Sequence, residues 1–138
     1  MAVRLDLSSL ESALARLPEA IDAQAQAPAN DLYRDATIHR FKVTYELTHK
    51  LLRRYLEMAA ATPQTIDELA FPDVIRLGSE QGLLRSGWDR WKDYRQARGT
   101  TSHTYDAAKA LEVLAIVPDF LAEARHLAET LARRTEAP

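Results

Sequence analysis

Hydrophobic residues recur at three- and four-residue spacing along most of the chain, which is the pattern of amphipathic helices. It predicts a first helix over residues 7–24, a long second helix over residues 31–61, and further helices over residues 73–81, 86–97 and 107–134. No segment shows the sustained two-residue alternation of a half-buried strand, so we expect no sheet. The pattern therefore predicts an all-α, up-and-down bundle of four or five helices.

The long second helix is apolar over an unusually wide arc. Polar side chains are confined to a narrow strip, and the strip consists of His39, Lys42, Glu46, Lys50, Arg53 and Glu57. A helix that is apolar over most of its circumference is buried on more than one side. This helix should therefore lie at the centre of the bundle or at a subunit interface.

Length and composition limit the class of protein. A chain of 138 residues without cysteine fits one helical domain over residues 1–138, and it can form neither a disulfide nor a thiolate metal site. No stretch approaches the roughly 20 apolar residues that a membrane span requires. We expect a soluble cytoplasmic protein that has no contact with a membrane and a frayed tail over residues 135–138.

Net charge gives no general attraction for nucleic acid, because the formal value is −2. Any RNA contact must therefore come from a local group of cations. One such group precedes residue 99 and consists of Arg85, Arg90, Lys92, Arg95 and Arg98. The alternative interpretation is a solvated helix face on which Asp89 and Asp93 alternate with the cations.

Two Glu-x-x-His pairs, Glu46 with His49 and Glu123 with His126, are typical of di-iron bundles. Such a site needs all its ligands to point inward. At about 100° per residue, His126 lies far from the apolar face of its helix. We therefore predict no metal and no cofactor.

The segment between the last two predicted helices gathers groups that can act on phosphate. Arg98 supplies a planar fork of donors suited to phosphate oxygens. His103 can exchange a proton near neutral pH, and Tyr105 adds a phenol two residues later. These residues are candidates for gripping or cutting a phosphodiester without metal; the alternative is an ordinary polar loop.

Two segments, residues 38–50 and residues 98–106, together resemble the nucleotidyltransferase substrate-binding protein family, which belongs to the HEPN superfamily of helical domains. Their sequences are IHRFKVTYELTHK and RGTTSHTYD. The likeness runs from Leu5 to about Leu131. It includes Trp91, seven residues before Arg98, and the Pro-Asp-Phe step that begins at Pro118.

The resemblance implies a HEPN-like homodimer made alongside a small nucleotidyltransferase, in a toxin and antitoxin pair. It implies that Arg98 and His103 of both subunits form one metal-independent ribonuclease cleft. It further implies that the nucleotidyltransferase silences the toxin by adenylylating Tyr105. Glu46 and Lys50 are further candidates for supporting roles, together with Ser102, because neighbouring inner helices would place Glu46 and Lys50 beside residues 98–103; the alternative for Glu46 and Lys50 is ion pairing on the helix surface.

Two positions depart from the pattern of that family. Gly99 stands where a polar residue, commonly asparagine, follows the arginine, and Lys42 stands where glutamate is usual. Two other functions therefore stay open at this point. The chain could be a non-catalytic subunit that presents substrate to the nucleotidyltransferase, or a helical scaffold with an inert loop.

Overall fold

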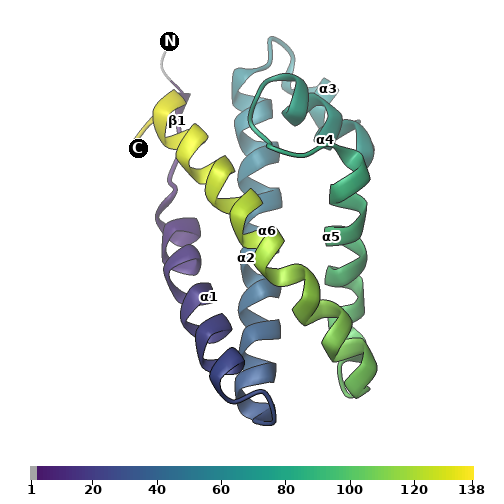
Figure 1. Cartoon of the computed structure of the whole chain (residues 1–138). Coiled ribbons are helices and arrows are strands. Elements are labelled where there is room, and N and C mark those ends of the chain that lie inside the picture. Colours follow the sequence, from purple (N-terminus) through teal and green to yellow (C-terminus); the bar gives the residue numbers. More distant parts are fainter. Residues whose placement is uncertain (1–2) are drawn as a thin grey trace.

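The computed structural model describes residues 3–138, and its elements are almost entirely helical. In chain order they are β1 (Val3–Arg4), α1 (Ser8–Gln26), α2 (Asp31–Ala59), α3 (Pro63–Asp67), α4 (Phe71–Glu80), α5 (Trp88–Thr100), a 3-10 turn η1 (Thr101–His103), α6 (Ala107–Arg134) and β2 (Thr135–Glu136). Figure 1 shows α2 between α1 and α5, with α6 crossing in front of α2. Successive long helices run in opposite directions, which confirms the predicted all-α, up-and-down bundle. None of these helices is long and apolar enough to cross a membrane.

The two ends of the described chain pair through short strands, which the sequence did not predict. β1 and β2 form a parallel pair in which Val3 lies opposite Thr135 and Arg4 opposite Glu136. The amide of Leu5 continues the pairing by donating to the carbonyl of Glu136 at 3.0 Å. The predictions of a frayed tail and of no sheet are therefore wrong at these residues. Strands of two residues are too short to produce a visible alternation.

An aromatic cluster joins the three inner helices at the centre of the bundle. Phe41 and Tyr45 come from α2, Trp91 and Tyr94 from α5, and Phe120 from α6, and all five are buried. The Phe120 ring lies edge-on to Phe41 at 5.3 Å and to Tyr94 at 5.2 Å between centroids. Tyr45 lies 6.2 Å from Trp91. Burial of α2 against more than one neighbour is thus confirmed, and the cluster fixes α5 against α2 and α6.

A buried carboxylate fixes the beginning of α5. The side chain of Glu123 on α6 has no exposed surface. It accepts hydrogen bonds from the backbone amides of Arg85 and Ser86, each at 3.0 Å, and from the indole nitrogen of Trp91 at 2.7 Å. Three donors offset the cost of removing the charge from water. Glu123 therefore links α6 to the α4–α5 connection and to α5 itself.

Candidate active site

The last turn of α5 carries Arg98, and its guanidinium reaches across to α2. The Nε atom donates to the Oε1 atom of Glu46 at 3.1 Å, and the Nη2 atom donates to the same oxygen. The Nη1 atom donates to the Thr101 hydroxyl at 3.3 Å. Arg98 is 26% exposed and Glu46 is 54% exposed. The guanidinium is thus held in a defined orientation while part of it still faces solvent, as a phosphate-binding group must.

His103 ends η1 and lies on the surface a short distance further along the chain. Its imidazole lies 6.2 Å from the ring of Tyr105, with an interplanar angle of 77°. Tyr105 is 87% exposed. The structure therefore presents both the imidazole and the phenol to solvent.

Hydrogen-bonded turns, not a flexible loop, connect Arg98 to α6. The Thr101 hydroxyl donates to the Arg98 carbonyl at 2.6 Å, and the amide of Asp106 donates to the His103 carbonyl at 3.2 Å. Asp106 caps α6, because its carboxylate accepts from the amide of Ala108 at 2.9 Å. The helix end predicted at residue 97 is wrong, since α5 continues to Thr100 and η1 follows directly, so that residues 99–103 form no loop. The hydroxyls of Thr100 and Thr101 bond back to the carbonyls of Gln96 and Arg98, so both side chains are held against the preceding turn.

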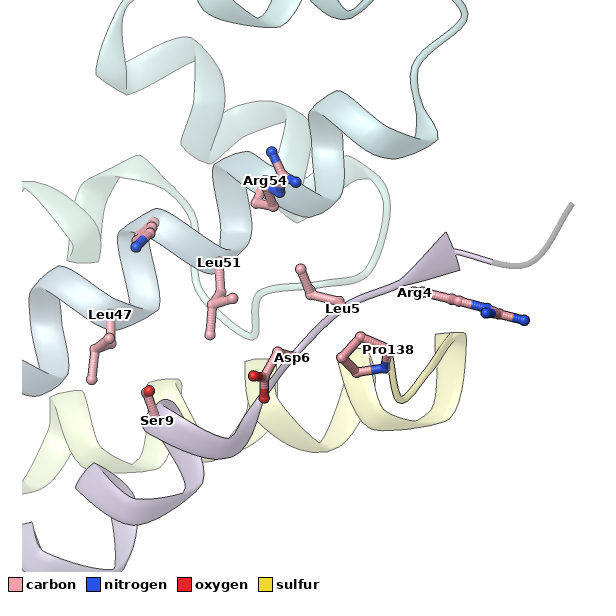
Figure 2. Close-up of a pocket in the computed structure, with 9 residues that line it drawn as sticks. Arg4, Leu5, Asp6, Ser9, Leu47, Leu51, Arg54 and Pro138 are labelled. Atoms are coloured by element: carbon pink, nitrogen blue, oxygen red, sulfur yellow. The ribbon is translucent and has the colours of Figure 1, made fainter.

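The supporting residues are not all brought to the same place. Glu46 binds Arg98 directly, while Ser102 lies within η1 and is exposed. Lys50 is one turn further along α2 and lines a different hollow, of about 370 Å³, beside the N-terminal segment. Figure 2 shows Leu47 and Leu51 of α2 in that hollow, with the guanidinium of Arg4 directed away from them. The labelled cationic side chains of this lining, Arg4 and Arg54, do not point toward a common centre, so the hollow is not an evident anion-binding site.

The five-residue group of cations predicted before residue 99 is divided by the structure. Arg90 faces α6, where its Nε atom donates to Asp119 at 2.7 Å. The Tyr94 hydroxyl also donates to Asp119, and this bond, followed by the hydrogen bond and the charge of Arg90, lowers the pKa of the aspartate. Arg95, in contrast, lies over the ring of Phe71, with 4.9 Å between its Cζ atom and the ring centroid. Only part of the group therefore lies on the α2 side with Arg98.

Sequence reasoning missed the structural role of Glu123. The motif pairs Glu123 with His126, yet Glu123 lies three positions after Phe120 and four before Leu127, on the apolar stripe of its helix. A carboxylate on such a stripe needs donors from another element. Among residues 3–138 no group of three or more histidine, aspartate or glutamate residues is placed to hold a metal ion.

Comparisons with known proteins identify the family. The family model described as nucleotidyltransferase substrate binding protein like matches residues 5–133. A Haemophilus influenzae protein named probable ribonuclease HepT is 32% identical over 145 residues, which cover 99% of this chain and 98% of that protein.

Solved structures agree with this assignment. A Haemophilus influenzae structure, described as revealing the fold of a substrate binding domain of a nucleotidyltransferase, matches with a TM-score of 0.85 and 30% identity, over 91% of this chain and 98% of the other. A crystal structure of a Thermus thermophilus protein matches with a TM-score of 0.71 and 30% identity, over 90% of this chain and 99% of the other. The resemblance found in the sequence is therefore confirmed, and the chain belongs to the nucleotidyltransferase substrate binding protein family.

Proposed function

We propose that the protein is a HEPN toxin-like homodimer that cuts RNA without metal and is controlled by a partner nucleotidyltransferase. The observation that carries this proposal is the placement of Arg98, whose guanidinium is oriented by Glu46 and Thr101 on the same exposed edge as the η1 turn. The relative named probable ribonuclease HepT supports the same activity.

The chemistry needs only an anion-binding group and proton carriers. One His103 takes the proton from a ribose 2′-hydroxyl, and the 2′-oxygen attacks the adjacent phosphorus. The bond from phosphorus to the 5′-oxygen breaks, and a second imidazole protonates the leaving oxygen. Arg98 stabilises the negative charge that develops on the phosphoryl oxygens. The products are a 2′,3′-cyclic phosphate and a 5′-hydroxyl, with no water consumed in this step.

A second copy of the chain supplies the second imidazole. His103 is exposed in the single chain, and the apolar side chain of Leu111 is 63% exposed on the helix that follows it. Burying this side chain across a twofold axis favours association. We expect light scattering to give twice the chain mass of 15.5 kDa. A monomer at micromolar concentration would contradict the shared cleft.

Tyr105 is the proposed point of control. Its hydroxyl would attack the α-phosphorus of ATP, release pyrophosphate and lose its proton, so that AMP becomes attached. The new phosphate places negative charge close to His103, where the RNA phosphate has to bind. Co-expression with the nucleotidyltransferase should add one AMP per chain by mass spectrometry, and Tyr105→Phe should prevent the addition. An AMP found on another residue would contradict this assignment.

The test of the ribonuclease activity uses the purified, unmodified protein. RNA oligonucleotides in EDTA should be cut to fragments that end in cyclic phosphate. A matched oligonucleotide with 2′-deoxyribose at the cut should stay intact, because the attacking oxygen is missing. RNA that stays intact with a dimeric, AMP-free protein would contradict the proposal.

A second candidate function is a non-catalytic subunit that presents substrate to the nucleotidyltransferase. The description of the Haemophilus influenzae structure as a substrate binding domain favours it. This function predicts saturable binding of the transferase substrate and no cleavage of RNA. The EDTA assay therefore separates the two.

Gly99 provides a further prediction. A β-carbon at this position would meet no atom within 4 Å, so asparagine fits, and the family resemblance implies a polar residue here. We expect Gly99→Asn to speed RNA cleavage about tenfold through one added hydrogen bond to the transition state, a gain of roughly 1.4 kcal/mol. Gly99→Ala is the control, because it raises helix propensity without adding an amide. Equal rates for both variants would show that the side-chain amide has no role.

A further inference from the structure

The exposed border between α2 and α5 carries two cations that the proposed chemistry does not use. We call this pair the basic strip and define it as Arg53 of α2 together with Arg95 of α5. Arg95 is exposed and Arg53 is half-buried. Arg95 precedes Arg98 by three residues, and Arg53 follows Glu46 by seven. Residues at these spacings lie on the same side of a helix, so the strip extends from the Arg98–Glu46 pair.

Arg53 and Arg95 lie near a common ring although they come from different helices. Arg95 lies over Phe71, the same ring contacts His49 at 4.7 Å, and Arg53 follows His49 by four residues on α2. In agreement, the pKa of His49 is lowered by burial first, and then by the charges of Arg53 and Arg95. Likewise, burial raises the pKa of Tyr45 to about 12, and the charges of Arg95 and Arg98 oppose the rise. The guanidiniums of Arg53, Arg95 and Arg98 therefore follow one another along the same helix border, and the lowered pKa of His49 disfavours a further positive charge there.

Two of these side chains are already held in place. The guanidinium of Arg95 lies over Phe71, whose ring also contacts His49 at 4.7 Å and Trp88 at 5.8 Å. Arg53 donates from its Nη1 atom to the carbonyl of Ile66 at 3.2 Å. Side chains that are ordered beforehand lose less entropy when they bind an anion.

Acidic groups limit the strip to a short length. At one end Glu46 is occupied by Arg98. At the other end Glu57 lies beside Asp67, which raises the pKa of Glu57, while Arg53 lowers it. Between these ends the charged residues of α2 are Lys50, Arg53 and Arg54, all positive. Glu46 and Glu57 are eleven residues apart, a helical rise of about 16 Å, which leaves room for about two phosphates.

We propose that the basic strip binds the backbone of the single-stranded RNA next to the bond that is cut. This inference rests on the proposed ribonuclease function and extends it to the flanking nucleotides. Arg95 and Arg53 would contact consecutive phosphates beyond the one held by Arg98. A guanidinium stacked on an aromatic ring also presents a flat surface to a base, as in single-strand binding sites. Because net charge is −2, this local strip would carry most of the attraction for RNA.

The experiment measures RNA binding in a background that cannot cut. Full-length His103→Ala protein is titrated into a fluorescent single-stranded RNA, and the dissociation constant is followed over a range of salt concentrations. The double variant Arg53→Gln/Arg95→Gln should bind about tenfold more weakly or worse. Its slope of log affinity against log salt should be shallower by about 1.4, for two lost phosphate contacts.

Two matched double variants control for charge and for packing. Arg76→Gln/Arg125→Gln removes two exposed cations from α4 and α6, away from the strip, and should leave affinity and slope within about twofold of the parent. Arg53→Lys/Arg95→Lys keeps both charges and should restore most of the affinity. If it binds as weakly as the glutamine variant with the same thermal midpoint, the strip does not act through charge on phosphate.

The outcomes separate this inference from the proposed function. If the wild-type protein cuts RNA and the strip variants bind and cut RNA like the control, the RNA-binding role of the basic strip is contradicted. The proposed ribonuclease activity would still stand. Wild-type protein that neither cuts nor binds RNA overturns both. Unchanged RNA binding with weakened binding of the nucleotidyltransferase would show that the strip is a surface for an acidic protein, and would also overturn the inference.

Discussion

Replacing His103 with alanine is expected to slow RNA cleavage by about 100- to 10,000-fold, the usual contribution of a positioned acid or base. Arg98→Ala should cost about 100- to 1,000-fold, because developing charge on the phosphate loses its donors. Arg98→Lys should retain part of the activity, since it keeps the charge but loses the fork that Glu46 and Thr101 orient. The measurement is the initial rate of cleavage in EDTA.

The fold should survive the loss of His103, because the imidazole lies outside the core. The imidazole is exposed and ends the η1 turn. His39→Ala is the matched control, since it removes an exposed histidine from α2 without touching the α5–α6 connection. Equal rates for His103→Ala and His39→Ala would mean that any cleavage comes from elsewhere.

Replacing Glu123 with alanine is expected to lower the free energy of unfolding by about 3–5 kcal/mol. The change would leave the amides of Arg85 and Ser86 and the indole nitrogen of Trp91 without their acceptor. It would also leave a cavity beside a fully buried side chain. Urea unfolding followed by circular dichroism measures the difference.

Glu123→Gln keeps the size of the side chain and one acceptor oxygen, but its amide group cannot accept from the remaining donors. It should therefore lie between wild type and Glu123→Ala, with a loss of about 1–3 kcal/mol. If the Glu123→Ala protein does not fold, the free energy of unfolding is measured on Glu123→Gln instead. Glu112→Ala, at an exposed position of the same helix, should change stability by less than about 0.5 kcal/mol. A urea midpoint of Glu123→Ala equal to that of the wild-type protein would contradict the stabilising role of this carboxylate.

The helices could be predicted because their information is local. Apolar residues three and four positions apart on α2 and α6 fix which side of each helix is buried, whatever it is buried against. The observed α2, Asp31–Ala59, accordingly lies within two residues of its predicted range. The α5–α6 connection was less predictable, because threonine hydroxyls and backbone amides continue the helical turns past Gly99.

By itself, the sequence determined the all-α class, the wide apolar face of α2 and the Arg98, His103 and Tyr105 spacing that led to the family. Tertiary structure alone decided which groups meet. The ion pair between Arg98 and Glu46 connects residues that are far apart in the chain. The hydrogen bond from the Trp91 indole nitrogen to Glu123 does the same between α5 and α6. The physical reason is that a periodic pattern specifies the face of a helix but not the neighbour or crossing angle that packing selects. Which charged side chains of separate helices become partners is therefore determined only by how the helices pack against one another.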